Sequence, residues 1–165
     1  EHDAVWPDDA LGVLRRDYPH LAIFGGLEKS LTLDSGAFVH LLILGTTDPT
    51  YLRMHDPAEV LGRARRRGHL TVLAHPFRWD GAAELLDGPD LPDALEMRTN
   101  NHVGPPVAAA AAAAERLGLP LVNAGDVHSA AAVDKFWIET RRPLGRGVDI
   151  RRIVRDGAYV NRTGR

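Results

Sequence analysis

The sequence predicts an α/β fold with parallel strands. Short apolar runs typical of strands alternate with longer segments of helical pattern, and short connections join them. No repeat, linker or long disordered tract interrupts this alternation. A chain of 165 residues also fits one domain, residues 1–165, which is large enough to bury roughly 70% of its unfolded surface.

Strands are expected where a short apolar run ends at a loop. The run 70–74 stops at His75, and because Pro76 disfavours helical backbone at the residue before it, His75 should remain extended. The predicted strands cover residues 21–27, 37–44, 70–75, 93–98, 119–124 and a segment around 136–138.

Helices are expected where capping residues flank a helical pattern. Asp56 precedes and Gly68 follows one such segment, and Gly118 ends another that contains seven consecutive alanines, residues 108–114. Pro7 stands where the first turn of a helix tolerates proline. The predicted helices cover residues 7–17, 56–67, 106–117 and 148–156.

The composition excludes several kinds of chemistry. There is no cysteine, which rules out disulfides, thiolate ligands and a cysteine nucleophile, so any metal must be bound by oxygen and imidazole groups. The net charge of -2, from 20 basic and 22 acidic residues, gives no global basic field for nonspecific nucleic-acid binding.

Targeting signals are also missing from the sequence. No apolar run approaches the roughly 18 to 20 residues of a membrane span, and no basic and then apolar signal segment opens the chain. We therefore expect a soluble, cytoplasmic protein with no membrane partner. The chain begins at Glu1 rather than methionine, within what resembles a motif, so we expect further sequence upstream.

Asp126 and His128 are the most informative pair of residues. Apolar residues lead into Gly125, as in a buried strand that runs out into a loop. The Asp-x-His spacing then places a carboxylate and an imidazole on the same side of extended backbone. Two types of metal ligand should therefore face one point.

Other ligand-type residues stand at comparable positions. His75 ends an apolar run, His40 lies inside another and Glu28 ends a fourth. Because strand ends converge on one face in barrels and open α/β sheets, ligands scattered in sequence can meet there. The pattern predicts a polynuclear metal site. The candidate ligands are His2, Glu28, His40, His75, Asp126 and His128.

The ligand types indicate which metals would bind. Imidazoles and carboxylates together suit zinc, manganese or iron better than the all-oxygen sites of magnesium or calcium. Any single histidine is more often a surface or hydrogen-bonded residue, but six ligand-type residues at strand ends or inside strands favour a site. The remaining histidines stand beside charged, turn or loop residues and are expected to be solvated. They are His20, His55, His69 and His102.

Neighbouring residues admit two interpretations each. Arg78 could reach a phosphate at the metals or form a structural salt bridge, and Glu96 could support a ligand or be an ordinary strand carboxylate. Asp3 could orient His2 or weakly cap the first helix. The arginines 65–67 could form a phosphate patch, although at a helix end they better complement the helix dipole. The tryptophans could stack on a nucleotide base, but packing in the core or at the rim of the site is the favoured interpretation. They are Trp6, Trp79 and Trp137.

The order of these elements resembles the polymerase and histidinol phosphatase superfamily, usually called the PHP domain. The resemblance covers nearly the whole chain, from residue 2 to about 160, and rests on the joint order of short elements that individually recur by chance. Those elements are Glu1-His2-Asp3, Gly26-Leu-Glu-Lys-Ser30, His40 with Leu44-Gly45, Ala74-His-Pro-Phe-Arg78, Leu95-Glu96, and Gly118-Leu-Pro followed by Gly125-Asp-Val-His-Ser129.

The resemblance implies a distorted seven-stranded (β/α) barrel whose strand ends hold up to three divalent metal ions. It gives the ligand role to the six candidate ligands, with Glu28 bridging two ions. The His-x-His strand with which that family begins has no counterpart here, which would leave two of the three metals under-coordinated. The expected fold is therefore a (β/α)7 barrel of the PHP type, truncated at its N-terminus.

The function expected from the resemblance is metal-dependent hydrolysis of phosphoesters. Small nucleotides or phosphorylated metabolites are the favoured substrates, because the chain offers no extended basic groove for a long nucleic acid. The residues assigned to catalysis are Glu28 and Asp126, which act through a metal-activated hydroxide, and Arg78, which stabilises the phosphoryl charge. Two alternatives stay open: a PHP module of a DNA polymerase, acting as a 3'-5' exonuclease or a structural metal site, and a metal-binding fold without turnover.

Overall fold

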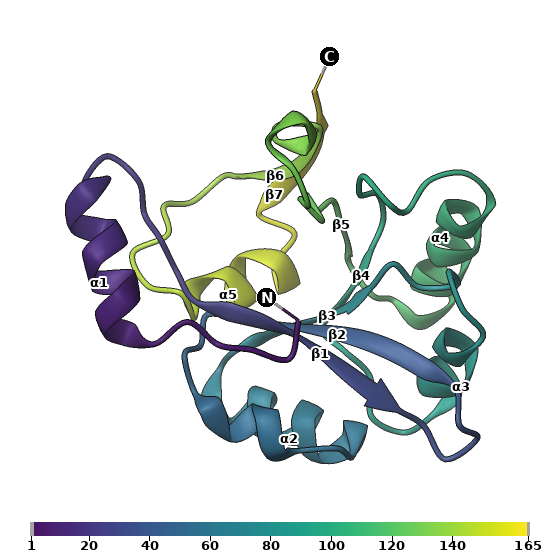
Figure 1. The fold of residues 1–165 in the computed structure, drawn as a ribbon. Helices are drawn as coiled ribbons and strands as arrows, with labels where there is room; N and C mark the ends of the chain where they lie inside the picture. The colour runs from purple at the N-terminus through teal and green to yellow at the C-terminus, as the bar shows by residue number, and fades with distance from the viewer. Residues whose placement is uncertain (1, 165) are drawn as a thin grey trace.

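A mixed sheet with the strand order β1-β2-β3-β4-β5 forms the centre of the molecule (Figure 1). The structure is a computed structural model that describes residues 2–164, so that Glu1 of the Glu1-His2-Asp3 element lies outside the described residues. A separate antiparallel pair, β6 and β7, projects from one side of this sheet. The strands are β1 Gly26–Thr32, β2 Phe38–Leu44, β3 Leu70–Ala74, β4 Ala94–Glu96, β5 Leu121–Val122, β6 Phe136–Thr140 and β7 Tyr159–Thr163.

The strand directions follow from the lengths of the connections. Only residues 33–37 join β1 to β2, which permits an antiparallel hairpin, whereas a parallel crossover needs a dozen residues or more. β2 also pairs antiparallel with β3, while β3, β4 and β5 are mutually parallel. The parallel pairs are connected through α3, Gly81–Asp87, and α4, Pro105–Leu117.

The predicted (β/α)7 barrel is wrong. The alternation of strands and helices is real, but the central sheet is open and β6 and β7 form a sheet of their own. The expectation of parallel strands fails at β1 and β2, because the short loop between them reverses the chain direction. The α/β class is therefore correct and the closed parallel architecture is not.

The predicted helices form close to their expected positions. The Asp56 side chain accepts a hydrogen bond from the Ala58 N–H at the start of α2, and Gly68 ends that helix in a left-handed conformation, φ 76°. Gly118 ends α4 in the same way. The pattern missed α3, the short helices η1 Pro49–Arg53 and η2 Ala130–Ala132, and strand β7. The three other helices are α1 Asp8–Asp17, α2 Pro57–Arg67 and α5 Asp149–Arg155.

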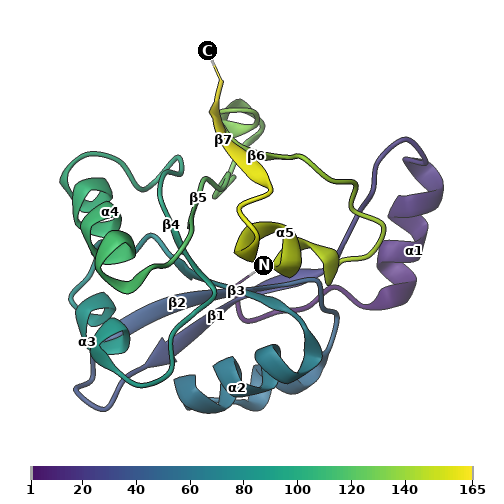
Figure 2. The ribbon, with the colours of Figure 1, turned by 180° about the vertical axis from the view of Figure 1, so that it is seen from behind.

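Two hydrophobic clusters cover opposite faces of the central sheet. Alternation along β2 sends Val39, Leu41 and Ile43 into the larger cluster, together with apolar residues of α2, α3 and α4. Leu42 and Leu44 point to the other face, where α5 and the β6–β7 pair pack. Figures 1 and 2 show α2 and α5 on opposite sides of the sheet. His40 points to the same face as Leu42 and Leu44 and is partly exposed there.

Two local predictions need correction, and both affect the candidate ligands. The first strand begins at Gly26 rather than residue 21, so Glu28 lies inside β1 instead of at its end. His75 is not extended, because its φ is 30°, in the left-handed region. Among residues 2–164, no helix has both the length and the apolar character that a membrane crossing requires.

Candidate metal centre

The register of β1 and β2 brings Glu28 and His40 together. Glu28 pairs with Leu42 and Ser30 pairs with His40, so Glu28 and His40 are diagonal neighbours on the same face of the sheet. Nδ1 of His40 lies 2.8 Å from Oε1 of Glu28. The hairpin thus supplies one carboxylate and one imidazole from adjacent strands.

His75 joins this pair from the end of β3. His40 pairs with Ala74, so the next residue emerges at the same end of the sheet. Nε2 of His75 lies 3.0 Å from Nδ1 of His40 and 3.7 Å from Oε1 of Glu28. The side chain is buried, 4% exposed, so it is held between these partners rather than in solvent.

His2 approaches from the N-terminal segment, which runs beside β1. A bridge joins His2 to Glu28, and the Asp3 N–H donates to the Glu28 carbonyl oxygen. Nε2 of His2 lies 3.5 Å from Oε2 of Glu28. Asp3 neither orients His2 nor caps α1: its carboxylate accepts from buried Lys29 at 2.7 Å and from the Ser30 N–H.

The arrangement of the converging side-chain atoms is better suited to coordinating a metal ion than to hydrogen bonding among themselves. Oε1 of Glu28 is buried and accepts no directional hydrogen bond, although ring nitrogens of His40 and His75 lie beside it. Ligands of one ion bound at about 2.0 to 2.2 Å are themselves roughly 3 to 3.5 Å apart. The four separations between the side-chain atoms here are 2.8, 3.0, 3.5 and 3.7 Å. His2, Glu28 and His40 each offer a ligand atom within 4.8 Å of the others. His75 is outside that group of three, but its Nε2 contacts His40 and Glu28. We term the four residues His2, Glu28, His40 and His75 the Glu28 cluster.

The electrostatics keep Glu28 ionised. Burial alone would raise its pKa, but the contact with His40 and the charges of His2, His40 and His75 outweigh burial, and the net pKa is lowered. An ionised carboxylate whose two oxygens face different imidazoles is suited to bind a cation. The cluster can therefore hold a divalent ion through mixed nitrogen and oxygen donors.

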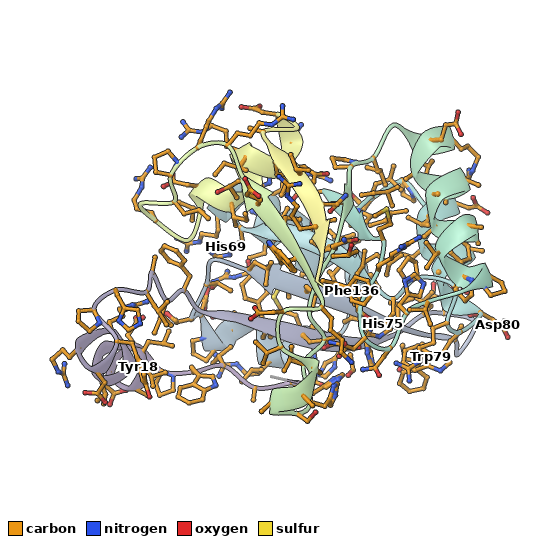
Figure 3. All side chains as sticks on the ribbon, turned by 90° about the horizontal axis from the view of Figure 1, so that it is seen from above. Tyr18, His69, His75, Trp79, Asp80 and Phe136 are labelled. Atoms are coloured by element: carbon orange, nitrogen blue, oxygen red, sulfur yellow. The ribbon has the colours of Figure 1, made fainter. Side chains whose placement is uncertain are left out.

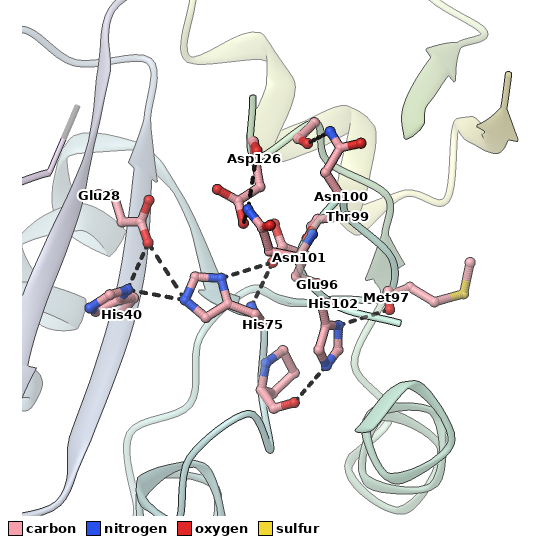
Figure 4. Close-up of polar contacts among 12 residues, drawn as sticks. Glu28, His40, His75, Glu96, Met97, Thr99, Asn100, Asn101, His102 and Asp126 are labelled. Carbon is pink, nitrogen blue, oxygen red and sulfur yellow. Dashed lines mark hydrogen bonds and ion pairs between the residues drawn. The ribbon is translucent and has the colours of Figure 1, made fainter. Parts of the chain in front are cut away.

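Glu96 supports His75 from behind. It lies at the end of β4, is 2% exposed, and accepts a hydrogen bond from the His75 N–H at 2.6 Å. Its Oε2 is also 3.5 Å from Nδ1 of the His75 ring. Figure 4 shows His75 between Glu28 and His40 on one side and Glu96 on the other. A carboxylate behind a ligand imidazole is the usual means of fixing its orientation.

Asp126 and His128 form a separate group. Asp126 is left-handed, φ 44°, so the predicted extended Asp-x-His geometry is wrong, although a turn still brings Nδ1 of His128 within 3.3 Å of the Asp126 carboxylate. Asn101 donates to Oδ2 of Asp126 at 2.8 Å (Figure 4). The His128 side chain is 67% exposed. Neither residue belongs to the group of ligand atoms that converge within 4.8 Å.

An aromatic cavity of about 420 Å³ opens beside the Glu28 cluster. Phe38, His40 and Trp79 line it, and the Trp79 ring packs edge to face against His40 and His75, with centroids 5.0 and 5.3 Å apart. Arg78 places its guanidinium over the Trp79 ring, 5.0 Å from the centroid, and makes no ion pair among residues 2–164. The geometry therefore does not support a structural salt bridge for Arg78.

Two histidines expected to be solvated are buried. His69 is 8% exposed and pairs through Nδ1 with the Tyr51 hydroxyl at 2.8 Å. His102 is 1% exposed, with its ring nitrogens 3.0 Å from the Met97 carbonyl oxygen and 2.8 Å from that of Pro76. His20 and His55 are exposed, as predicted.

Sequence reasoning underrated Glu96 and Trp79, and it passed over Asn101. The polar run 99–102 follows β4 in the same way that His75 follows β3, so the strand-end rule could have drawn attention to Asn101. No such rule identifies Trp79, because its role depends on the turn at residues 75–78. No protein-family model matches the chain, and the curated proteins likewise provide no match.

Proposed function

We propose that this protein is a metal-dependent phosphoesterase that acts on small phosphorylated compounds. The observation that carries the proposal is the convergence of three imidazoles on the two oxygens of Glu28, beside an open cavity. The order of the motif residues is similar to that of the PHP domain, which supports the same chemistry. The fold adds no such support, because the barrel of that family is not proposed for this chain. Zinc, manganese and iron are the metals that suit this ligand set.

Each residue of the cluster has a role in the proposal. Glu28, with one oxygen toward His2 and the other toward His40 and His75, would hold the cation or bridge two of them. Asp126 and His128 would complete the site from the neighbouring loop. A bound divalent ion supplies the charge that acidifies water and polarises a phosphoryl oxygen. Arg78 would stabilise the phosphoryl group from the edge of the site.

The aromatic cavity supports a small organic phosphoester as the substrate. Its volume of about 420 Å³ lies within the roughly 300 to 1,000 Å³ typical of small-ligand sites. Phe38 and Trp79, which are 55% and 43% exposed, offer apolar ring faces next to the cluster. The organic part of a small phosphoester would pack there, with its phosphate at the metals.

The test is a metal analysis combined with a phosphatase assay. The purified chain is loaded with zinc, manganese or iron, and turnover of p-nitrophenyl phosphate is measured. Glu28→Gln should lose both metal and turnover, whereas Glu115→Gln, which changes an exposed glutamate of α4, should lose neither. Turnover that survives in the Glu28→Gln protein would disprove the assignment.

A metal-binding fold without turnover is the second candidate. It is favoured by one observation, the engagement of Asp126 by Asn101 rather than by the Glu28 cluster. This candidate predicts stoichiometric metal binding that depends on Glu28 and no hydrolysis of any phosphoester tested. The same pair of measurements therefore separates the two functions.

A further inference from the structure

A second cavity, of about 560 Å³, lies at the other end of β3. β3 runs from Leu70 to Ala74, with the cavity-lining Gly68 before it and His75 after it. The four residue steps of extended chain from Leu70 to Ala74 alone span roughly 13 Å. Figure 3 labels His69 and His75 at the two ends of this strand. The second cavity is therefore remote from the Glu28 cluster.

Arginines dominate the lining of this cavity. Arg67 comes from the end of α2, and the others come from α5 and the turn before it. That turn is held against the end of β2 because Gly45 and Gly147 cross closely: a Cβ on Gly147 would lie 2.8 Å from the Gly45 Cα. The five lining arginines, which define the arginine cavity, are Arg67, Arg146, Arg151, Arg152 and Arg155.

The cavity contains more positive charge than its own carboxylates balance. Asp149 and Asp156 also line it, which leaves a net charge of +3. Asp149 accepts from the Arg146 N–H at 2.8 Å, and Asp156 pairs with Arg142, which is outside the lining. Asp149 also pairs with the Arg146 guanidinium at 3.4 Å, and the bidentate hydrogen bonds of Arg151 to Asp93 fix a second lining guanidinium.

Three guanidiniums remain without an ion pair. Among the ion pairs within residues 2–164, none includes Arg67, Arg152 or Arg155. Arg152 and Arg155 are three positions apart on α5, where like charges repel each other. Arginines at the C-terminal ends of α2 and α5 could be explained by their favourable interaction with the helix dipoles. That interaction does not explain Arg146, which precedes α5.

We propose that the arginine cavity binds a small anion that carries two or three linked phosphate groups. Guanidinium groups bind phosphate oxygens through paired, charge-assisted hydrogen bonds. Three uncompensated guanidiniums match a diphosphate or triphosphate better than a single phosphate. A long nucleic acid is disfavoured, because two aspartates line the cavity and the whole chain has a net charge of -2. This site is independent of the proposed phosphoesterase activity.

The experiment uses inorganic triphosphate as the probe and calorimetry on the full chain. Binding is measured in the Glu28→Gln protein, so that capture of triphosphate at the Glu28 cluster does not contribute. We expect saturable binding of one triphosphate, weakened about ten- to a hundred-fold by Arg152→Ala and by Arg155→Ala. Arg16→Ala, an exposed arginine on α1, is the matched control and should bind like the parent.

Three outcomes would overturn the proposal. The first is no saturable binding of triphosphate, and the second is binding by the Arg152→Ala and Arg155→Ala proteins that is as tight as in the Glu28→Gln parent. The third is binding of single-stranded oligonucleotides with an affinity that rises with length and exceeds that of triphosphate, which would indicate a nucleic-acid surface instead. Urea unfolding of each variant shows whether a loss of binding reflects a loss of folding, and Arg155→Lys provides a variant that retains the charge.

Discussion

The Glu96 carboxylate binds the backbone N–H of His75 and lies beside the ring of the same residue. Its Oε2 accepts a hydrogen bond from the His75 N–H at 2.6 Å and lies 3.5 Å from Nδ1 of the same residue. His75 has a φ of 30°, which few residues other than glycine adopt, so this contact supports a strained position beside the Glu28 cluster. The position of one imidazole in the cluster thus depends on a carboxylate that lies outside it.

Glu96→Gln should weaken metal binding without unfolding the protein. Glutamine can still accept from the His75 N–H but loses the charge that polarises the ring, so we expect metal affinity to fall about ten- to a hundred-fold. Metal titration measures the effect, and Glu139→Gln, at an exposed position of β6, is the control. Unchanged affinity would mean that Glu96 has only a backbone role.

Arg78→Ala should separate catalysis from metal binding. If the guanidinium contacts the substrate phosphate, kcat/KM should fall roughly ten- to a few hundred-fold while metal content stays constant. His75→Ala should instead lose metal as well as activity. The control is Arg53→Ala, an exposed arginine of η1. A lower melting temperature with unaltered kcat/KM would show that Arg78 only packs on Trp79.

Asp126→Asn tests whether the site is polynuclear. If Asp126 and His128 bind an additional ion, the variant should contain fewer ions per chain than the parent and still retain metal at the Glu28 cluster. Elemental analysis of both proteins after dialysis against a metal-free buffer measures this ratio. Identical ratios would restrict the metal centre to the four residues around Glu28.

Stability should fall on acidification because of His69. Burial lowers the pKa of His69 below its usual value near 6.5, so the folded state favours the neutral ring. The unfolded chain takes up a proton first as pH falls, and the stabilisation that is fully present above about pH 6.5 is lost as pH approaches the lowered pKa. Urea unfolding at pH 8 and pH 5.5 measures the difference.

Three variants test the contribution of His69 to stability and to its dependence on pH. Tyr51→Phe removes the hydroxyl that pairs with Nδ1 of His69 and should cost about 1 to 3 kcal/mol at pH 8. His69→Asn should reduce the dependence on pH, while His20→Asn, at an exposed position, should leave it unchanged. An equal loss of stability on acidification in the His69→Asn protein would exclude His69 as the source.

The positions of α1, α2, α4 and α5 could be predicted because their signals are local, whereas α3 was missed. Asp56 and Gly68 bound α2, and the alanine run ends at Gly118, through contacts within a few residues of sequence. Strand pairing depends on partners that are distant in sequence, and the family resemblance favoured a closed parallel arrangement that the short loop 33–37 excludes. The predicted start of β1 at residue 21 was wrong for the same reason, because Gly26 is the first residue of the strand with a partner on β2.

The site was predictable in part for a related reason. Glu28, His40 and His75 were selected as ligand types within or beside apolar strands, and pairing with β2 does bring them together. Glu96 was named as a possible support for a ligand, but its burial was not foreseen, and His102 was expected to be solvated. Both side chains are polar in sequence and are enclosed only by tertiary packing. Asp126 was expected on extended backbone, but its loop adopts a left-handed turn.

The hairpin that joins β1 and β2 also imposes an order of assembly. Its loop is five residues long, and hairpins of this kind close within microseconds, whereas contacts between distant segments must wait for larger loops to close. Glu28 and His40 share this hairpin, while His75 and Asp126 arrive through progressively longer stretches of chain. During folding, we expect a carboxylate and imidazole pair able to capture a metal to exist before the rest of its coordination shell does.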